Sequence, residues 1–182
     1  YQKGDSLAAR GLYGAAIQEL GLAEKDEGKL LRNRRQLLYG RLAYAHQQLG
    51  EYRKALGYYE KQLGMMGPSS PSRDDIMLNM TDLYLLTGEY RKVIAVLGKL
   101  PGDNAKKTIN MASALCRMGK TDDALKLLDE VATRTAPCAT AIMRQANVAA
   151  LQNKAFGLDM TGRHAEAYLL MKAVLPRLET KE

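Results

Sequence analysis

The chain has 182 residues, of which 46% are hydrophobic, and its 27 basic and 20 acidic residues give a formal net charge of +7. No apolar run approaches the ~20 residues that a membrane-spanning helix needs, which excludes a membrane span in this segment. The positive excess is modest for a nucleic-acid-binding protein, but it would favour an acidic partner.

The clearest pattern lies at residues 36–69, where Gly50 separates two amphipathic helices. Apolar and small residues recur at helical spacing on both sides, which predicts a helical hairpin with one buried stripe. These residues are Tyr39, Leu42, Ala43, His46, Ala55, Leu56, Tyr59 and Leu63. A glycine follows each first helix and sets the repeat register. These glycines are Gly11, Gly50, Gly88, Gly119 and Gly162.

The first two units differ mainly in their first helices. Only residues 1–10 precede the first turn, so that helix is either truncated or continues upstream. The second unit is predicted to begin with a long helix from Gly28 to Leu49. The prolines and serines of residues 64–75 then predict a flexible connection.

The later units vary in helix length. Pro101 and Gly102 predict an early end to the second helix of the third unit, and Asp103 or Asn104 is placed to cap the next helix. Residues 133–162 predict one extended first helix in the last unit.

The residues after each turn resemble the tetratricopeptide repeat family. LGEYRKALGYYEKQL at 49–63 and TGEYRKVIAVLGKL at 87–100 look like its turn and second helix, and MGKTDDALKLLDEV and TGRHAEAYLLMKAVL are similar. The family has small residues where its helices are in close contact. In this sequence the corresponding residues are Ala16, Ala43, Ala55, Thr81, Ala112, Ala124, Ala155 and Ala167, and Val93 is a departure from the pattern. The resemblance implies an all-α, right-handed superhelical solenoid of about five helix–turn–helix repeats in a single domain. The expected units are 1–27, 28–69, 72–102, 103–135 and 136–178.

Such solenoids expose a concave groove lined by the first helix of each repeat. The residues expected to line it are Arg41, Tyr44, Gln48, Asn79, Asp82, Lys106, Asn110, Ser113 and Arg117. Asparagine recurs there at Asn79, Asn110 and Asn153, and its amide can pair with the backbone of an extended peptide. The groove predicts a non-catalytic scaffold that binds a protein or peptide.

Some family members grip a peptide's terminal carboxylate with lysine, arginine and asparagine from three first helices. Lys106, Asn110 and Asn79 fall at suitable places, but Gly40 and Tyr44 stand where a lysine and an asparagine would be needed. The sequence therefore argues against this clamp.

A looser preference for an acidic peptide remains as an alternative. Arg41, Lys106 and Arg117 would attract such a peptide, and Asp75 and Asp82 would oppose it locally.

No pattern indicates an enzyme, a metal site or a cofactor. His46 lies on the buried stripe and is expected to be a hydrogen-bonded core residue, while His164 lies in a turn. Cys116, near the groove edge, and Cys138, near a helix start, lack a neighbouring base and are expected to be inert thiols.

Nucleic-acid binding through the basic segment 30–41 is a weaker alternative. The tyrosines that base stacking would require fall at packing positions of the repeat. These tyrosines are Tyr52, Tyr59, Tyr84 and Tyr90.

The two ends suggest a further alternative, a helical interaction or sensor module of a longer bacterial envelope or signalling protein. Tyr1 is not a start methionine, and no polar capping helix follows Pro176, so the open ends are also a candidate surface for self-association. The expected compartment is the bacterial periplasm or cell envelope, with the cytoplasm as the alternative.

Overall fold

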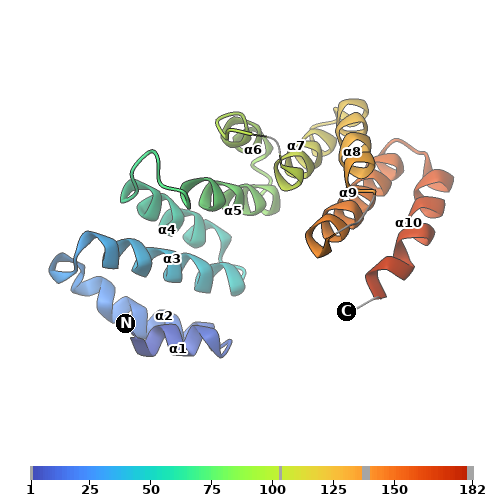
Figure 1. The fold of residues 1–182 in the computed structure, drawn as a ribbon. Coiled ribbons are helices and arrows are strands. Elements are labelled where there is room, and N and C mark those ends of the chain that lie inside the picture. The colour runs from blue at the N-terminus through green and yellow to red at the C-terminus, as the bar shows by residue number, and fades with distance from the viewer. Residues whose placement is uncertain (1, 103, 137–139, 180–182) are drawn as a thin grey trace. The chain divides into compact units, whose positions relative to one another are not determined.

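The computed structural model describes residues 2–102, 104–136 and 140–179, and each regular element in these ranges is a helix (Figure 1). The α-helices are α1 Gln2–Ala9, α2 Tyr13–Lys25, α3 Arg32–Gln48, α4 Tyr52–Gly64, α5 Arg73–Leu86, α6 Tyr90–Leu97, α7 Ala105–Arg117, α8 Thr121–Thr135, α9 Ala141–Met160 and α10 His164–Glu179. A short 3-10 helix, η1, spans Glu27–Lys29. The predicted all-α class is confirmed.

The helices form two compact units, Tyr1–Thr87 with α1–α5 and Gly88–Glu182 with α6–α10. The boundary falls at the turn of the third predicted hairpin, so α5 belongs to the first unit and α6 to the second. The single domain expected from the sequence stays a prediction.

The first unit contains the hairpins α1–α2 and α3–α4, with α3 packed on α2 and α5 packed on α4 (Figure 1). Leu20, Leu38 and Leu42 are almost fully buried at the junction between the two hairpins. Burying a leucine contributes about 1.5–3 kcal/mol, so this contact is a main stabiliser of the stack.

The second unit contains α6 packed on α7, followed by the hairpins α7–α8 and α9–α10. Figure 1 shows α9 lying along α8, and α9 contacts both helices of the preceding hairpin. Its core is made of the buried residues Ile109, Ala112, Cys116, Ala124, Leu128, Val131 and Ala150.

The turn glycines confirm the predicted register. Gly50 has φ 75°, and its backbone N–H donates to Gln47 O at 3.0 Å while that of Glu51 donates to His46 O at 2.9 Å. This pair of bonds satisfies the last carbonyls of α3 and requires the left-handed conformation that glycine adopts without strain. Positive φ is shared by all five predicted glycines, Gly11, Gly50, Gly88, Gly119 and Gly162.

Small side chains mark the places where helices approach closely. Ala43, Ala55 and Ala112 are each 0% exposed, and Val93 is buried equally well in the slot where it departs from the repeat pattern. Short side chains at these contacts let the neighbouring helix approach and pack densely.

The predicted long helix from Gly28 is wrong at its start. The chain forms η1 and then passes through Leu30 and Leu31 in extended conformation, with ψ 141° and 152°, before α3 begins at Arg32. Leu30 packs against the buried leucines of the first unit. Burial of this side chain therefore favours the break.

The predicted short second helix of the third unit and long first helix of the last unit are confirmed, but the predicted start of the long helix is wrong, because residues 133–135 belong to α8 and α9 begins at Ala141. Helix α6 has 8 residues and α9 has 20, compared with 13 in α7. Asn104 and Thr140 cap α7 and α9, each accepting a hydrogen bond from the backbone N–H three residues on. None of the described helices combines the length and apolarity required to cross a membrane.

Candidate partner-binding surfaces

An exposed stripe runs along α3 in the first unit. Arg41, Tyr44 and Gln48 are exposed at helical spacing, whereas Leu42 and Ala43 between them are buried. The stripe is therefore presented by a helix whose other face is fixed in the core.

The contacts of this stripe moderate its charge. Arg41 Nε lies 3.1 Å from Asp5 Oδ1 on α1, so part of its positive charge is neutralised. Tyr44 is 43% exposed, and its ring packs edge-on against Tyr13 with 5.9 Å between the centroids. The hydrogen bond to Tyr44 raises the pKa of the Tyr13 hydroxyl.

Asn79 and Asp82 on α5 are half-buried, less accessible than the α3 stripe. Burial raises the pKa of Tyr59 to about 12, and the negative charge of Asp82 adds to that shift. The predicted residues of the first unit thus carry charges of both signs.

The predicted residues of the second unit lie on α7, but they are not equally available. Lys106 and Arg117 are exposed, whereas Asn110 is only 7% exposed. The prediction that Asn110 lines an open surface is therefore wrong, because the turn of α7 places it in the core.

Ser113 is engaged within the fold. Its hydroxyl oxygen lies 2.6 Å from Asn153 Oδ1 on α9 and 2.9 Å from Ile109 O, and both oxygens can accept a hydrogen bond from the hydroxyl. The Asn153 amide donates to Ala149 O at 2.9 Å. This serine and this asparagine link two first helices, a structural use that the sequence did not reveal.

Arg117 at the end of α7 lies against two aromatic rings. Its Cζ is 5.1 Å from the Phe156 centroid on α9 and 6.0 Å from the Tyr90 centroid on α6. Sequence reasoning placed Tyr90 at a packing position and missed that Tyr90 and Phe156 meet at one arginine. Only the packing of three helices brings them together.

A polar network joins the two hairpins of the first unit. The Tyr58 hydroxyl donates to Glu24 Oε2 at 2.8 Å, Lys61 Nζ lies 2.9 Å from Glu24 Oε1, and the Tyr39 hydroxyl donates to Glu27. Burial, reinforced by these carboxylates, raises the pKa of both tyrosines to about 12. The network is a structural contact between hairpins.

His46 is a buried, hydrogen-bonded core residue, which confirms the prediction. Its ring stacks on Tyr58 at 5.3 Å, and its Nδ1 pairs with Glu51. This hydrogen bond is the main reason that the pKa of Glu51 is lowered.

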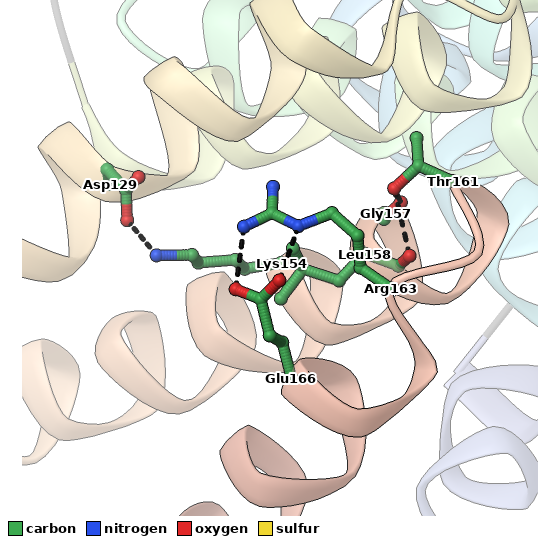
Figure 2. Close-up of polar contacts among 7 residues, drawn as sticks. All are labelled: Asp129, Lys154, Gly157, Leu158, Thr161, Arg163 and Glu166. Atoms are coloured by element: carbon green, nitrogen blue, oxygen red, sulfur yellow. Dashed lines mark hydrogen bonds and ion pairs between the residues drawn. The ribbon is translucent and has the colours of Figure 1, made fainter.

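A second set of polar contacts fixes the last hairpin (Figure 2). Arg163 in the α9–α10 turn donates two parallel hydrogen bonds to Glu166, at 2.7 and 2.6 Å, and this pairing lowers the pKa of the Glu166 carboxyl. Figure 2 also shows Lys154 on α9 reaching Asp129 on α8. The Thr161 hydroxyl donates to Leu158 O at 2.9 Å. The Lys154–Asp129 contact joins α9 to α8, whereas the other contacts order the α9–α10 turn.

The cysteine predictions are answered in part. Cys116 is 1% exposed within the core, so its expected place at the groove edge is wrong; burial raises the pKa of its thiol, as expected for an unreactive group. Cys138 lies outside the described residues.

Within the described residues, no group of three or more His, Cys, Asp or Glu side chains is arranged to hold a metal ion. His164 is exposed and pairs with Asp159 at 2.7 Å.

Comparison with known proteins identifies the repeat. Residues 38–68 match the family model described as tetratricopeptide repeat. No curated protein sequence matches the chain significantly.

Solved structures share the fold at low sequence identity. The crystal structure of a Podosopora anserina putative kinesin light chain with nearly identical TPR-like repeats has 18% identity and a TM-score of 0.71, over 100% of this chain and 94% of that chain. A tetratricopeptide repeat protein from Parabacteroides merdae ATCC 43184 has 16% identity and a TM-score of 0.75, over 96% and 62%. MamA AMB-1 has 19% identity and a TM-score of 0.61, over 98% and 96%.

The hairpin matched by the family model is the one that carries Gly50 and the buried Ala43 and Ala55. The same left-handed turn and buried small residues recur along the chain. Residues 38–68 thus match the tetratricopeptide repeat model, and the chain shares the fold of solved tetratricopeptide repeat structures.

Proposed function

We propose that this protein is a non-catalytic scaffold that binds a protein or peptide on its first helices. The exposed stripe of Arg41, Tyr44 and Gln48 on α3 carries this proposal, and Lys106 and Arg117 provide a second stripe on α7. Repeat solenoids are typical interaction scaffolds, because stacked hairpins present extended surfaces.

The physical advantage is preorganisation. Leu42 and Ala43 anchor the buried face of α3, so the helix backbone that carries the stripe is already ordered before a partner arrives. Binding then costs less conformational entropy than binding to a flexible loop. Tyr44 adds a large ring with few rotatable bonds, a side chain enriched at interface hot spots.

The test uses uncharged peptides, so that it does not depend on electrostatic attraction. Peptides without Asp or Glu are selected by display on the immobilised full chain, synthesised with amidated C-termini, and measured by fluorescence polarisation. The Tyr44→Ala and Lys106→Ala variants examine the stripes on α3 and α7. The matched controls, Arg53→Ala and Lys126→Ala, remove exposed side chains from the second helices α4 and α8.

At least one stripe variant should weaken binding by about fivefold or more, which is the effect of a modest hot spot. The controls should leave affinity unchanged. If selected peptides lose affinity only in the control variants, the second helices bind the partner and the proposal is wrong.

A further inference from the structure

Arg117 differs from the other cations of the first-helix stripes in its surroundings. Arg41 is paired with Asp5, whereas no acid in the described part of the chain pairs with Arg117. Its guanidinium is held instead by Tyr90 and Phe156, which come from two other helices of the same unit. The arginine is thus positioned, but its hydrogen-bond donors are not used by an acid.

This arrangement suits a carboxylate ligand. An arginine can stack its planar face on an aromatic ring while the N–H groups at its edge remain available, and two of those groups match both oxygens of a carboxylate. Contact with the rings also limits the rotamers of Arg117 before binding, which reduces the entropy lost when a ligand binds.

A cavity beside Tyr90 extends the site. It has a volume of about 550 Å³ and is lined by Gly88, Glu89, Tyr90, Arg91, Lys92 and Met118. Lys92 pairs with Glu89 at 2.5 Å, but the exposed Arg91 has no acid paired with it in the described ranges. The cavity therefore offers a second cation, with space for a side chain next to the one bound at Arg117.

We infer that Arg117, clamped by Tyr90 and Phe156, binds a carboxylate side chain of an acidic peptide segment, with a neighbouring acidic residue entering the cavity at Arg91. This inference rests on the proposed function and names the chemistry of the partner. It assigns the recognition to Arg117, with Arg91 as a second cation, and not to the net charge of the protein.

The probe is a fluorescein-labelled hexaglutamate peptide with an amidated C-terminus, titrated against the full chain by fluorescence polarisation. The Arg117→Ala variant should weaken binding about tenfold, because a bidentate charge-assisted pair is lost. The Arg117→Lys variant keeps the charge without the planar fork and should weaken it about threefold or more. Phe156→Leu, which removes one ring of the clamp, should also weaken it, and by more than the control described below.

The control is Lys126→Ala, which removes an equal charge from an exposed position on α8 of the same unit. Its affinity for hexaglutamate should stay within about twofold of the parent. Circular dichroism establishes that each variant is folded.

Two results would overturn the inference. If Arg117→Ala and Lys126→Ala weaken binding equally, the attraction is nonspecific and comes from the net charge. If hexaglutamate does not bind, no acidic site exists at Arg117. In either case, uncharged peptides that still bind the α3 or α7 stripe leave the proposed function standing, so the two failures are distinguishable.

Discussion

The packing of α9 against the preceding hairpin depends on Gly157, and a side chain there should destabilise the second unit. Gly157 is buried, and a Cβ atom added to it would lie 3.2 Å from Cys116 Sγ, 3.2 Å from Leu125 Cδ2 and 3.4 Å from Thr121 Cγ2. These three atoms belong to both helices of the α7–α8 hairpin. A larger side chain would therefore press on α7 and α8 at once.

The expected cost of Gly157→Val follows from two opposing effects. Overpacking a tight core costs about 1–3 kcal/mol. Replacing a helical glycine by valine recovers only a few tenths of a kcal/mol through helix propensity. Because valine adds two methyl groups beyond the Cβ that already meets its neighbours, we expect a net loss of about 2 kcal/mol.

The free energy of unfolding is measured by urea denaturation followed by circular dichroism. The matched control is Gly57→Val on α4, where an added Cβ meets nothing within 4 Å, and its stability should change by less than about 0.5 kcal/mol. Adding Cys116→Ala to Gly157→Val creates space beside the valine, so the pair should show a coupling energy of at least about 0.5 kcal/mol. Equal effects of the two valine substitutions, with no coupling to Cys116, would refute the proposed packing constraint.

Three further predictions concern the first unit. The pKa of Glu51 is lowered from 4.5 mainly by its hydrogen bond to His46, so its contribution to stability is present above about pH 4.5 and is lost as pH falls through the lowered value. The urea midpoint of Glu51→Gln should be below that of the parent at pH 7, and the difference should shrink as the pH is lowered below about 4.5. A difference that does not shrink on acidification would contradict this. The pKa of Tyr58 is raised from 10.0 to about 12 by burial and Glu24, so its contribution to the free energy of unfolding is complete below about pH 10 and is lost as pH rises through about 12. Absorbance titration of Tyr58→Phe should show one fewer late-ionising phenol than the parent. An unchanged count would mean that Tyr58 is not one of the late-ionising phenols. Gly50→Ala places a side chain at φ 75° and should cost about 1 kcal/mol, whereas no measurable loss on denaturation would mean that the turn relaxes.

The sequence was sufficient to predict the helical hairpins and their register. The turns can be located in the sequence from their glycines, because Gly50 and its counterparts adopt the left-handed conformation where each first helix ends. The extended α9 and the short α6 were also predictable, since apolar periodicity and the Pro101–Gly102 pair act locally. The start of α3 was not, because the break at Leu30 depends on burial of that side chain against the first unit's core.

The residues of the candidate site were also predicted only in part from the sequence. The helical period placed Arg41, Tyr44 and Gln48 correctly on one exposed stripe. It failed for Asn110 and Cys116, because a small rotation of a helix against its neighbours decides whether a residue at the edge of a stripe is buried.

The sequence by itself determined the repeat unit, since turn glycines and apolar spacing are properties of short segments. Tertiary structure alone decided which charges are available. Arg41 and Arg117 are alike as exposed arginines on first helices, but α1 brings Asp5 to the first, while α6 and α9 bring Tyr90 and Phe156 to the second. The physical reason is that ion pairing and stacking act over a few ångströms, between residues that only the packing of separate helices makes neighbours.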